Sequence, residues 1–326
     1  MDLADRAQLI RSGDRRALAR AITLVESNRA DHRAEALALL AALRQPERQA
    51  LRIGLSGTPG VGKSTFIEAF GLMLTAQGLK VAVLAVDPSS ARSGGSILGD
   101  KTRMERLSRD PLAFIRPSPS QTQLGGVARR TREAVALCEA AGFDVVLIET
   151  VGVGQSETVV AELSDLFVLL LAPAGGDELQ GVKRGIMEMA DLILVNKADG
   201  ELKAAARRTV ADYSGALQLL RRRTQDPDGF PKALPVSALT GDGLAEAWTD
   251  MRTLADWRRT EGHWARTRAT QARHWFREEV RRGLLEGLEH PPQQAAIAGL
   301  GDRVASGELT PEKAAADFLV RFGQKR

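Results

Sequence analysis

The sequence of 326 residues contains one cysteine, Cys138, which excludes an internal disulfide and agrees with a cytoplasmic protein. No run of about 18 apolar residues occurs, so no transmembrane helix is expected. Residues 1–5 lack the basic and apolar regions of a signal peptide. The four histidines do not pair with cysteine at the spacing of a metal site. The net charge is only +4, and neither nucleic acid nor a membrane is expected as a partner.

A glycine-rich motif, G-T-P-G-V-G-K-S-T, follows a short apolar run near residue 50 and precedes a helical pattern. This order of strand, loop and helix is typical of a phosphate-binding P-loop. Backbone N–H groups of such a loop surround phosphate oxygens, and the start of the helix adds partial positive charge. We expect Lys63 to reach the β- and γ-phosphates and the Ser64 hydroxyl to bind Mg²⁺. The candidate nucleotide-binding residues here are Gly57, Thr58, Pro59, Gly60, Val61, Gly62, Lys63, Ser64 and Thr65.

Apolar runs and helical periodicities alternate through the middle of the chain. The runs predict buried parallel strands, at 51–56, 80–86, 112–115, 143–148, 166–171, 192–195 and 233–236. The fold class is therefore predicted as α/β, with a doubly wound, mostly parallel sheet. We expect this P-loop domain at 49–260, with a helical extension at 1–48 before it and a helical region at 261–326 after it.

Two motifs at strand ends predict recognition of guanine. Asn196-Lys197-Ala198-Asp199 fits N-K-x-D, in which an ionised carboxylate accepts hydrogen bonds from N1–H and the N2 amine of guanine. Adenine has an acceptor at the ring position and would face the same carboxylate with a lone pair. Ser237-Ala238-Leu239 fits the second base-binding element, which donates a backbone N–H to guanine O6. Together with the P-loop, these motifs predict a P-loop GTPase domain.

Acidic residues at other strand ends are candidates for the surroundings of the metal and the attacking water. Glu149-Thr150-Val151-Gly152 stands where many GTPases have D-x-x-G, so Glu149 would hold Mg²⁺ through water and Gly152 would contact the γ-phosphate. Asp87 ends a strand expected near the P-loop, and Asp100 follows a Gly- and Ser-rich segment. Each has an alternative: Glu149 as an ordinary loop acid, Asp87 as a turn residue, and Asp100 as a helix N-cap.

The region after residue 261 shows only helical patterns. His263 to Leu288 is predicted as a helix interrupted at Gly283 and Gly287. Trp257, Trp264 and Trp275 would share one helical face if the segment were continuous, which predicts a packing or subunit interface. A solvated helix face is expected for a set of arginines, namely Arg266, Arg268, Arg273, Arg277, Arg281 and Arg282.

The sequence resembles the methylmalonyl-CoA mutase-associated GTPases, the MeaB-type proteins, over nearly its whole length. The motifs that carry the resemblance are G-T-P-G-V-G-K-S-T, V-L-A-V-D-P-S-S, I-E-T-V-G-V-G-Q-S-E, G-G-D-E-L-Q-G-V-K-R-G-I-M-E-M-A-D and N-K-A-D. The resemblance implies a homodimeric, metallochaperone-like GTPase that gates adenosylcobalamin loading of methylmalonyl-CoA mutase and protects it. It implies that Ser64, Asp87, Asp100 and Glu149 surround Mg²⁺. It also implies a switch loop over 175–183, with Asp177, Gln180 and Lys183 transmitting the nucleotide state.

Three other functions are weighed. Close relatives of the family serve other cobalamin mutases. A nickel-insertion GTPase would need Cys and His clusters, which this sequence lacks. A kinase or transport ATPase would need an adenine site, which N-K-A-D disfavours.

Val153 stands where Ras-like enzymes place a water-positioning glutamine. GTP hydrolysis is therefore expected to be slow alone and faster with the mutase.

Overall fold

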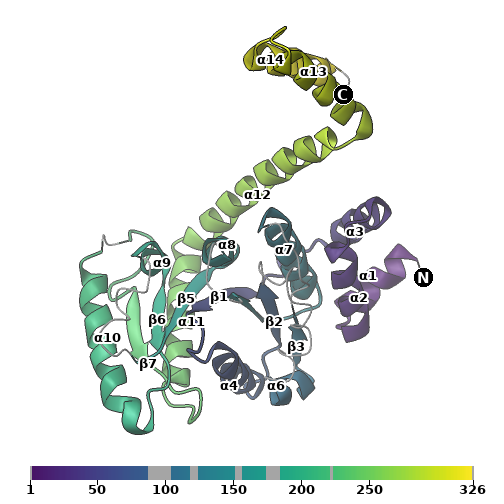
Figure 1. Ribbon diagram of the computed structural model, residues 1–326. Coiled ribbons are helices and arrows are strands. Elements are labelled where there is room, and N and C mark those ends of the chain that lie inside the picture. Colours follow the sequence, from purple (N-terminus) through teal and green to yellow (C-terminus); the bar gives the residue numbers. More distant parts are fainter. Residues whose placement is uncertain are drawn as a thin grey trace. The chain divides into compact units, whose positions relative to one another are not determined.

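A seven-stranded parallel sheet forms the centre of the protein in this computed structural model (Figure 1). The structure describes residues 2–86, 104–117, 124–150, 156–173, 184–220 and 223–324. The strand order is β3-β2-β4-β1-β5-β6-β7. The strands are β1 (Leu51–Gly57), β2 (Val81–Val86), β3 (Ala113–Arg116), β4 (Val145–Thr150), β5 (Leu166–Leu171), β6 (Leu192–Val195) and β7 (Lys232–Pro235). The predicted α/β fold and its seven strands are confirmed.

Helices cover both faces of this sheet. One face is covered by α4 (Lys63–Thr75), α6 (Glu105–Arg109) and α11 (Leu244–Thr260), whose apolar residues join those of the strands in one core cluster. Phe70 stacks on Phe66 and meets Trp248 edge-on, so α4 and α11 contact each other through aromatic rings. The other helices of the domain are α7 (Leu124–Ala140), α8 (Ser156–Leu163), α9 (Arg184–Met189), the 3₁₀ turn η3 (Gly200–Leu202) and α10 (Lys203–Gln218).

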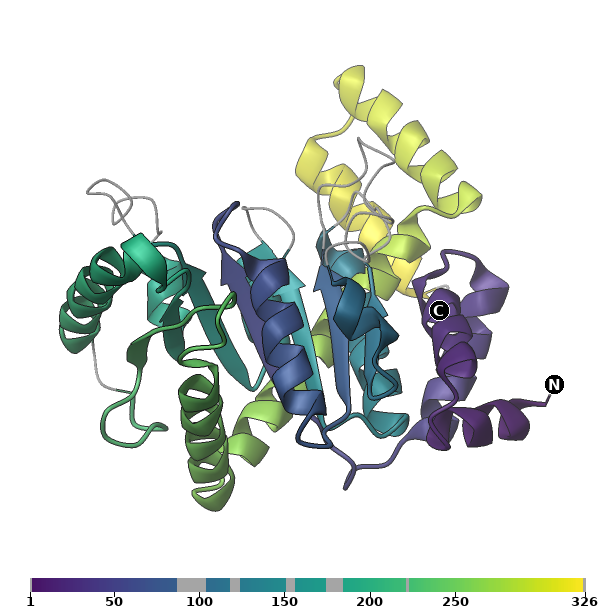
Figure 2. The same ribbon diagram turned by 90° about the horizontal axis from the view of Figure 1, so that it is seen from below.

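Three helices precede the first strand: α1 (Leu3–Arg11), α2 (Arg15–Glu26) and α3 (Ala30–Leu43). They lie together beside α7 and β3, as both views show (Figures 1 and 2). Leu18, Ile22 and Val25 of α2 are buried, which fits their helical spacing in the sequence. Arg33 on α3 and Glu133 on α7 form an ion pair at 2.7 Å, so this helical group is also tied to the sheet domain by charge.

The chain divides into two compact units, residues 1–268 and 269–326. The helix α12 (His263–Leu288) is continuous, so the expected interruption at Gly283 and Gly287 is wrong. Glycine inside a helix costs only about 1 kcal/mol relative to alanine, which neighbouring helical residues can outweigh. The second unit also contains α13 (Pro291–Ala305) and α14 (Pro311–Gln324). No helix among the described residues is long and apolar enough to cross a membrane.

The tryptophan face predicted from the sequence is not formed. The helix α11 ends at Thr260, and Gly262 has a φ of +71°, so Trp257 and Trp264 do not lie on one helix. Trp264 instead donates from Nε1 to Oε1 of Gln49 at 3.0 Å and packs against the core cluster of the first unit.

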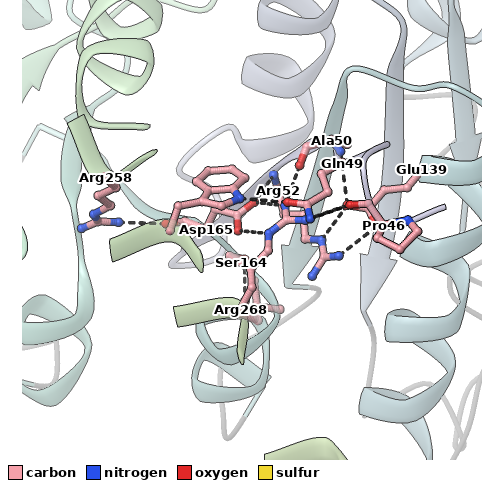
Figure 3. A network of polar contacts seen from close by, with 11 residues as sticks. Pro46, Gln49, Ala50, Arg52, Glu139, Ser164, Asp165, Arg258 and Arg268 are labelled. Carbon is pink, nitrogen blue, oxygen red and sulfur yellow. Dashed lines mark hydrogen bonds and ion pairs between the residues drawn. The ribbon is translucent and has the colours of Figure 1, made fainter. Parts of the chain in front are cut away.

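One of the arginines expected on a solvated face, Arg268, has only 11% of its side chain exposed and lies in an ion network (Figure 3). Arg268 donates from Nε and Nη2 to the two carboxylate oxygens of Asp165, at 2.8 and 2.7 Å. Glu139 accepts from Arg268 at 3.3 Å and makes a bidentate pair with Arg52, at 3.0 and 2.8 Å. This network ties the first turns of α12 to the starts of β1 and β5.

A second buried cluster lies beside the first. Arg258, on α11, pairs with Asp191 at 2.7 Å and with Asp226 at 2.6 Å, and donates to the backbone oxygen of Asp165 at 2.8 Å. Arg223 also pairs with Asp191, at 2.6 Å. Asp165 and Asp191 directly precede β5 and β6, so both clusters lie at the amino end of the parallel strands.

Candidate nucleotide-binding site

The P-loop connects β1 to α4 at the carboxyl end of the sheet. A Cβ atom at Gly57 would lie 2.3 Å from the backbone oxygen of Leu170, so the backbone of β5 leaves no room for a side chain there. Gly62 has a φ of +89°, and a Cβ on it would lie 2.8 Å from Nδ2 of Asn196. Glycine is therefore needed at both positions, first for a close strand and then for the turn into the helix.

Lys63 begins α4, and its ammonium group turns back over the loop. Nζ donates to the backbone oxygens of Gly57 at 2.6 Å and Thr58 at 3.4 Å. Burial lowers the pKa of Lys63, while the negative charges of Glu149 and Glu157 oppose that shift. The ammonium is thus held by neutral carbonyl groups, which a phosphate oxygen can replace with a stronger, charge-assisted bond.

The N-K-A-D segment follows β6 and contacts the P-loop directly. Nδ2 of Asn196 donates to the backbone oxygen of Val61 at 2.9 Å, and Nζ of Lys197 donates to that of Gly60 at 2.8 Å. Lys197 has a φ of +58°, which sets it apart from the extended strand before it. The two motifs lie about 135 residues apart in sequence, yet hydrogen bonds join them.

The S-A-L segment completes the same cluster. Oδ1 of Asn196 accepts from the backbone nitrogen of Ala238 at 3.0 Å, and the hydroxyl of Ser237 donates to the carboxylate of Asp199. Ser237 is fully buried, whereas the side chain of Leu239 is 81% exposed. Asn196 therefore bridges the P-loop and the S-A-L segment, and Asp199 is oriented by Ser237 beside them.

Glu149 lies at the carboxyl end of β4, between the neighbouring strands β1 and β2. Its Cα is paired with Leu55 of β1 and with Ala85 of β2, and the residue is buried. The next residue, Thr150, donates from its hydroxyl to that of Ser56 at 3.2 Å, which ties the end of β4 to the P-loop strand. Sequence patterns did not single out this Ser–Thr contact.

A hydroxyl from Ser64 and a carboxylate from Glu149 are oxygen donors, the type that Mg²⁺ prefers, with water and phosphate oxygens as its usual further ligands. The residues present thus fit a magnesium ion shared with a nucleotide. Within the described ranges, no group of three or more His, Cys, Asp or Glu is placed to hold a metal by itself.

The remaining candidates lie outside the described residues: Asp87, Asp100, Gly152, Asp177, Gln180 and Lys183. Glu157, in the first turn of α8, was not predicted from the sequence, yet it is buried and its charge acts on Lys63. The signal was present in the sequence, because Glu157 is the last residue of the I-E-T-V-G-V-G-Q-S-E motif.

Comparisons with known proteins agree with this arrangement. Residues 18–292 match the family model described as methylmalonyl Co-A mutase-associated GTPase MeaB. A putative GTPase of Caulobacter vibrioides is 54% identical over 96% of this chain and 95% of its own length. The mouse protein named methylmalonic aciduria type A homolog, mitochondrial, is 50% identical over 96% of this chain and 78% of its own. The crystal structure of a LAO/AO transport system kinase aligns with a TM-score of 0.74 and 38% identity, covering 99% of this chain and 97% of that one.

Proposed function

Because the chain belongs to the family of methylmalonyl-CoA mutase-associated GTPases, we propose that it is a GTP-hydrolysing chaperone for methylmalonyl-CoA mutase. In this proposal GTP binding and hydrolysis gate adenosylcobalamin loading of the mutase and protect its activity. The observation that carries the nucleotide part is the Asn196 bridge, which joins the loop for the phosphates to the segments that read the base. Another cobalamin-dependent mutase is the alternative partner.

Each part of the site has one task in this proposal. Lys63 leaves the carbonyl groups of Gly57 and Thr58 and neutralises the β- and γ-phosphates. Asp199 accepts from guanine N1–H and N2, while the Ser237-Ala238-Leu239 segment offers a backbone N–H to O6. Ser64, Glu149, Asp87 and Asp100 surround Mg²⁺, which when bound neutralises charge on the phosphates, and Gly152 contacts the γ-phosphate.

Hydrolysis by the protein alone is proposed to be slow. Val153 has no polar group with which to orient the attacking water, so the acids Asp87 and Asp100 are the candidates for that task. Ordering a chain segment costs about 1–2 kcal/mol per residue, which contact with a partner can offset. We propose that the mutase supplies this contact, with the segment 175–183 carrying the nucleotide state through Asp177, Gln180 and Lys183.

The test is single-turnover hydrolysis of GTP, with and without purified methylmalonyl-CoA mutase, for the wild type and Lys183→Ala. ATP serves as the control nucleotide, because Asp199 would face a lone pair of adenine. The expected result is slow hydrolysis of GTP that the mutase accelerates, with less acceleration in Lys183→Ala. Fast hydrolysis alone, or no response to the mutase, contradicts the gating proposal. A full response in Lys183→Ala removes only that residue from it.

A homodimer formed through the second unit is part of the same proposal. Phe276, Val280 and Leu284 are spaced four residues apart on α12 and are 69%, 47% and 42% exposed. Residues at this spacing share one helical face, so they form an apolar stripe that a second copy of the chain would cover. Light scattering of the full chain and of Val280→Glu tests this, with Arg277→Glu as the control. A monomeric wild type contradicts the proposal.

A further inference from the structure

The helix α8 lies directly against the P-loop strand, and its direction follows from its contacts. The backbone nitrogen of Asp165, just after α8, donates to the backbone oxygen of Arg52 at the start of β1, at 2.9 Å. Further along β1, a Cβ atom on Gly54 would lie 2.8 Å from Val160 and 2.4 Å from Ser164. Going backwards along α8 therefore means going forwards along β1, toward the P-loop.

Glu157 lies further along α8 in the same direction, toward the proposed phosphate site. It lies three residues before Val160, and residues at this spacing share one helical face about one turn apart. The face that carries Val160 packs on β1, so Glu157 is directed toward the end of β1 and the P-loop. Only 5% of Glu157 is exposed, which is unusual for a glutamate. A buried carboxylate here faces the place where nucleotide phosphates are proposed to bind.

We propose that Glu157 is a positioning residue that holds Lys63 in its nucleotide-free contacts and thereby weakens nucleotide affinity. Its charge favours an ammonium group on Lys63, in agreement with the direction of its effect on the pKa of that lysine. Phosphates compete with Glu157 for the same ammonium and are also repelled by its carboxylate. Both effects oppose phosphate binding at this position, so Glu157 promotes nucleotide release.

This inference rests on the proposed nucleotide site, and Glu157→Gln tests it because the amide keeps the shape and removes the charge. Removing a negative charge near the proposed phosphate site removes a repulsion, so we expect GDP to bind about tenfold more tightly. GDP affinity and dissociation rate are measured by calorimetry and by displacement of a fluorescent GDP analogue. Glu162→Gln, on the exposed side of the same helix, is the matched control and should bind as the wild type does.

A purely structural role for Glu157 predicts a different result. An acidic residue in the first turn stabilises a helix, so its loss would lower the melting temperature without tightening nucleotide binding. Glu157→Asp keeps the charge and should stay close to wild-type affinity. Unchanged or weaker GDP binding by Glu157→Gln overturns the inference while leaving the proposed function standing. A wild type that binds no GDP overturns both.

The action through Lys63 is tested by a double-mutant cycle. Glu157→Gln is compared with the wild type in a Lys63→Gln background, at GDP concentrations high enough to measure weak binding. We expect the tenfold gain to shrink to less than about threefold when the ammonium is absent, because the competition then no longer exists. A full gain in that background overturns the inference, since Glu157 would then act on the phosphates alone.

Discussion

The two ends of the parallel sheet hold their lysine and arginine side chains in opposite ways. At the carboxyl end, Lys63 and Lys197 donate to backbone carbonyl groups of the P-loop. At the amino end, Arg52, Arg258 and Arg268 donate to carboxylates, most of them in bidentate pairs (Figure 3). Neutral acceptors can be exchanged for a phosphate at little cost, whereas paired carboxylates cannot be displaced without leaving charges buried.

This difference distinguishes the candidate nucleotide site, at the carboxyl end of the sheet, from the structural ion pairs at its amino end. Burial lowers the pKa of Lys63, whereas Arg258 has its pKa raised by Asp191 and Asp226 against an opposing effect of burial. A lysine can lose its proton when it is buried, and an arginine does not. Lys63 at the carboxyl end is thus sensitive to what binds, and arginines at the amino end fix α11 and the start of α12 on the sheet. Substitutions at the carboxyl end of the sheet should alter nucleotide binding, and substitutions at the amino end should alter the free energy of unfolding.

The largest effect is expected for Asp199→Asn at the carboxyl end. The amide donates where the carboxylate accepted, which suits O2 of xanthine and opposes the N2 amine of guanine. Preference for guanosine over xanthosine diphosphate should fall by about 10⁴-fold, or about 5.5 kcal/mol. Competition binding with both nucleotides measures this preference, and Asp242→Asn, an exposed residue in the loop between β7 and α11, is the control. Unchanged GDP binding with no gain for xanthosine diphosphate would show that Asp199 does not read the base.

A smaller effect, on stability instead of binding, is expected for Arg258→Ala at the amino end. The substitution leaves Asp191 and Asp226 buried without this partner, which typically costs about 3–5 kcal/mol of unfolding free energy. Urea denaturation measures this loss of unfolding free energy. Arg252→Ala, on the exposed side of α11, is the control and should change stability by less than about 0.5 kcal/mol. The folded variant should bind GDP as the wild type does, and a loss of affinity would break the separation of the two ends.

The cost of Arg258→Ala should also depend on pH. Burial raises the pKa of Asp226, and Arg258 opposes that shift. Without Arg258 the pKa of Asp226 rises further above the unfolded value of about 3.9. A raised folded-state pKa stabilises the fold below the unfolded pKa, and this contribution is lost as pH rises through the folded pKa. The difference between variant and wild type should therefore shrink as pH falls from neutral toward 5, and a difference that grows would contradict this reasoning.

The sequence predicted the carboxyl end better than the amino end, for a physical reason. Binding phosphate and guanine needs particular residues at fixed spacings, so G-x-x-x-x-G-K-S and N-K-A-D are visible in one dimension. The strands were equally visible, because buried parallel strands are continuous apolar runs. The ion pair of Arg268 with Asp165 joins residues 103 apart in sequence, and its arginine resembles its solvated neighbours on α12. Only the folded structure distinguishes Arg268 from the solvated arginines of the same helix.

The tryptophan face failed as a prediction because its premise was helix continuity. Gly262 takes a backbone conformation with positive φ and separates α11 from α12, whereas Gly283 and Gly287 remain helical. A glycine ends a helix or stays within it according to the packing around it, which single-residue propensity does not report. The apolar stripe on α12 is accordingly carried by Phe276, Val280 and Leu284 instead of the tryptophans.

The smallest effect is expected for Trp264→Phe, which probes the amino end more finely. The indole Nε1 donates to Gln49, and the ring lies against the guanidinium groups of Arg259 and Arg268, at 4.3 and 4.5 Å from its centroid. Phenylalanine keeps the ring contacts and loses one hydrogen bond, so unfolding should become easier by about 1 kcal/mol. Trp257→Phe, at an exposed residue of α11, is the control and should change stability less. GDP affinity should stay unchanged in both variants. A measurable change in GDP affinity with Trp264→Phe would show that the network at the start of α12 is coupled to the nucleotide site, and the two ends would no longer count as independent.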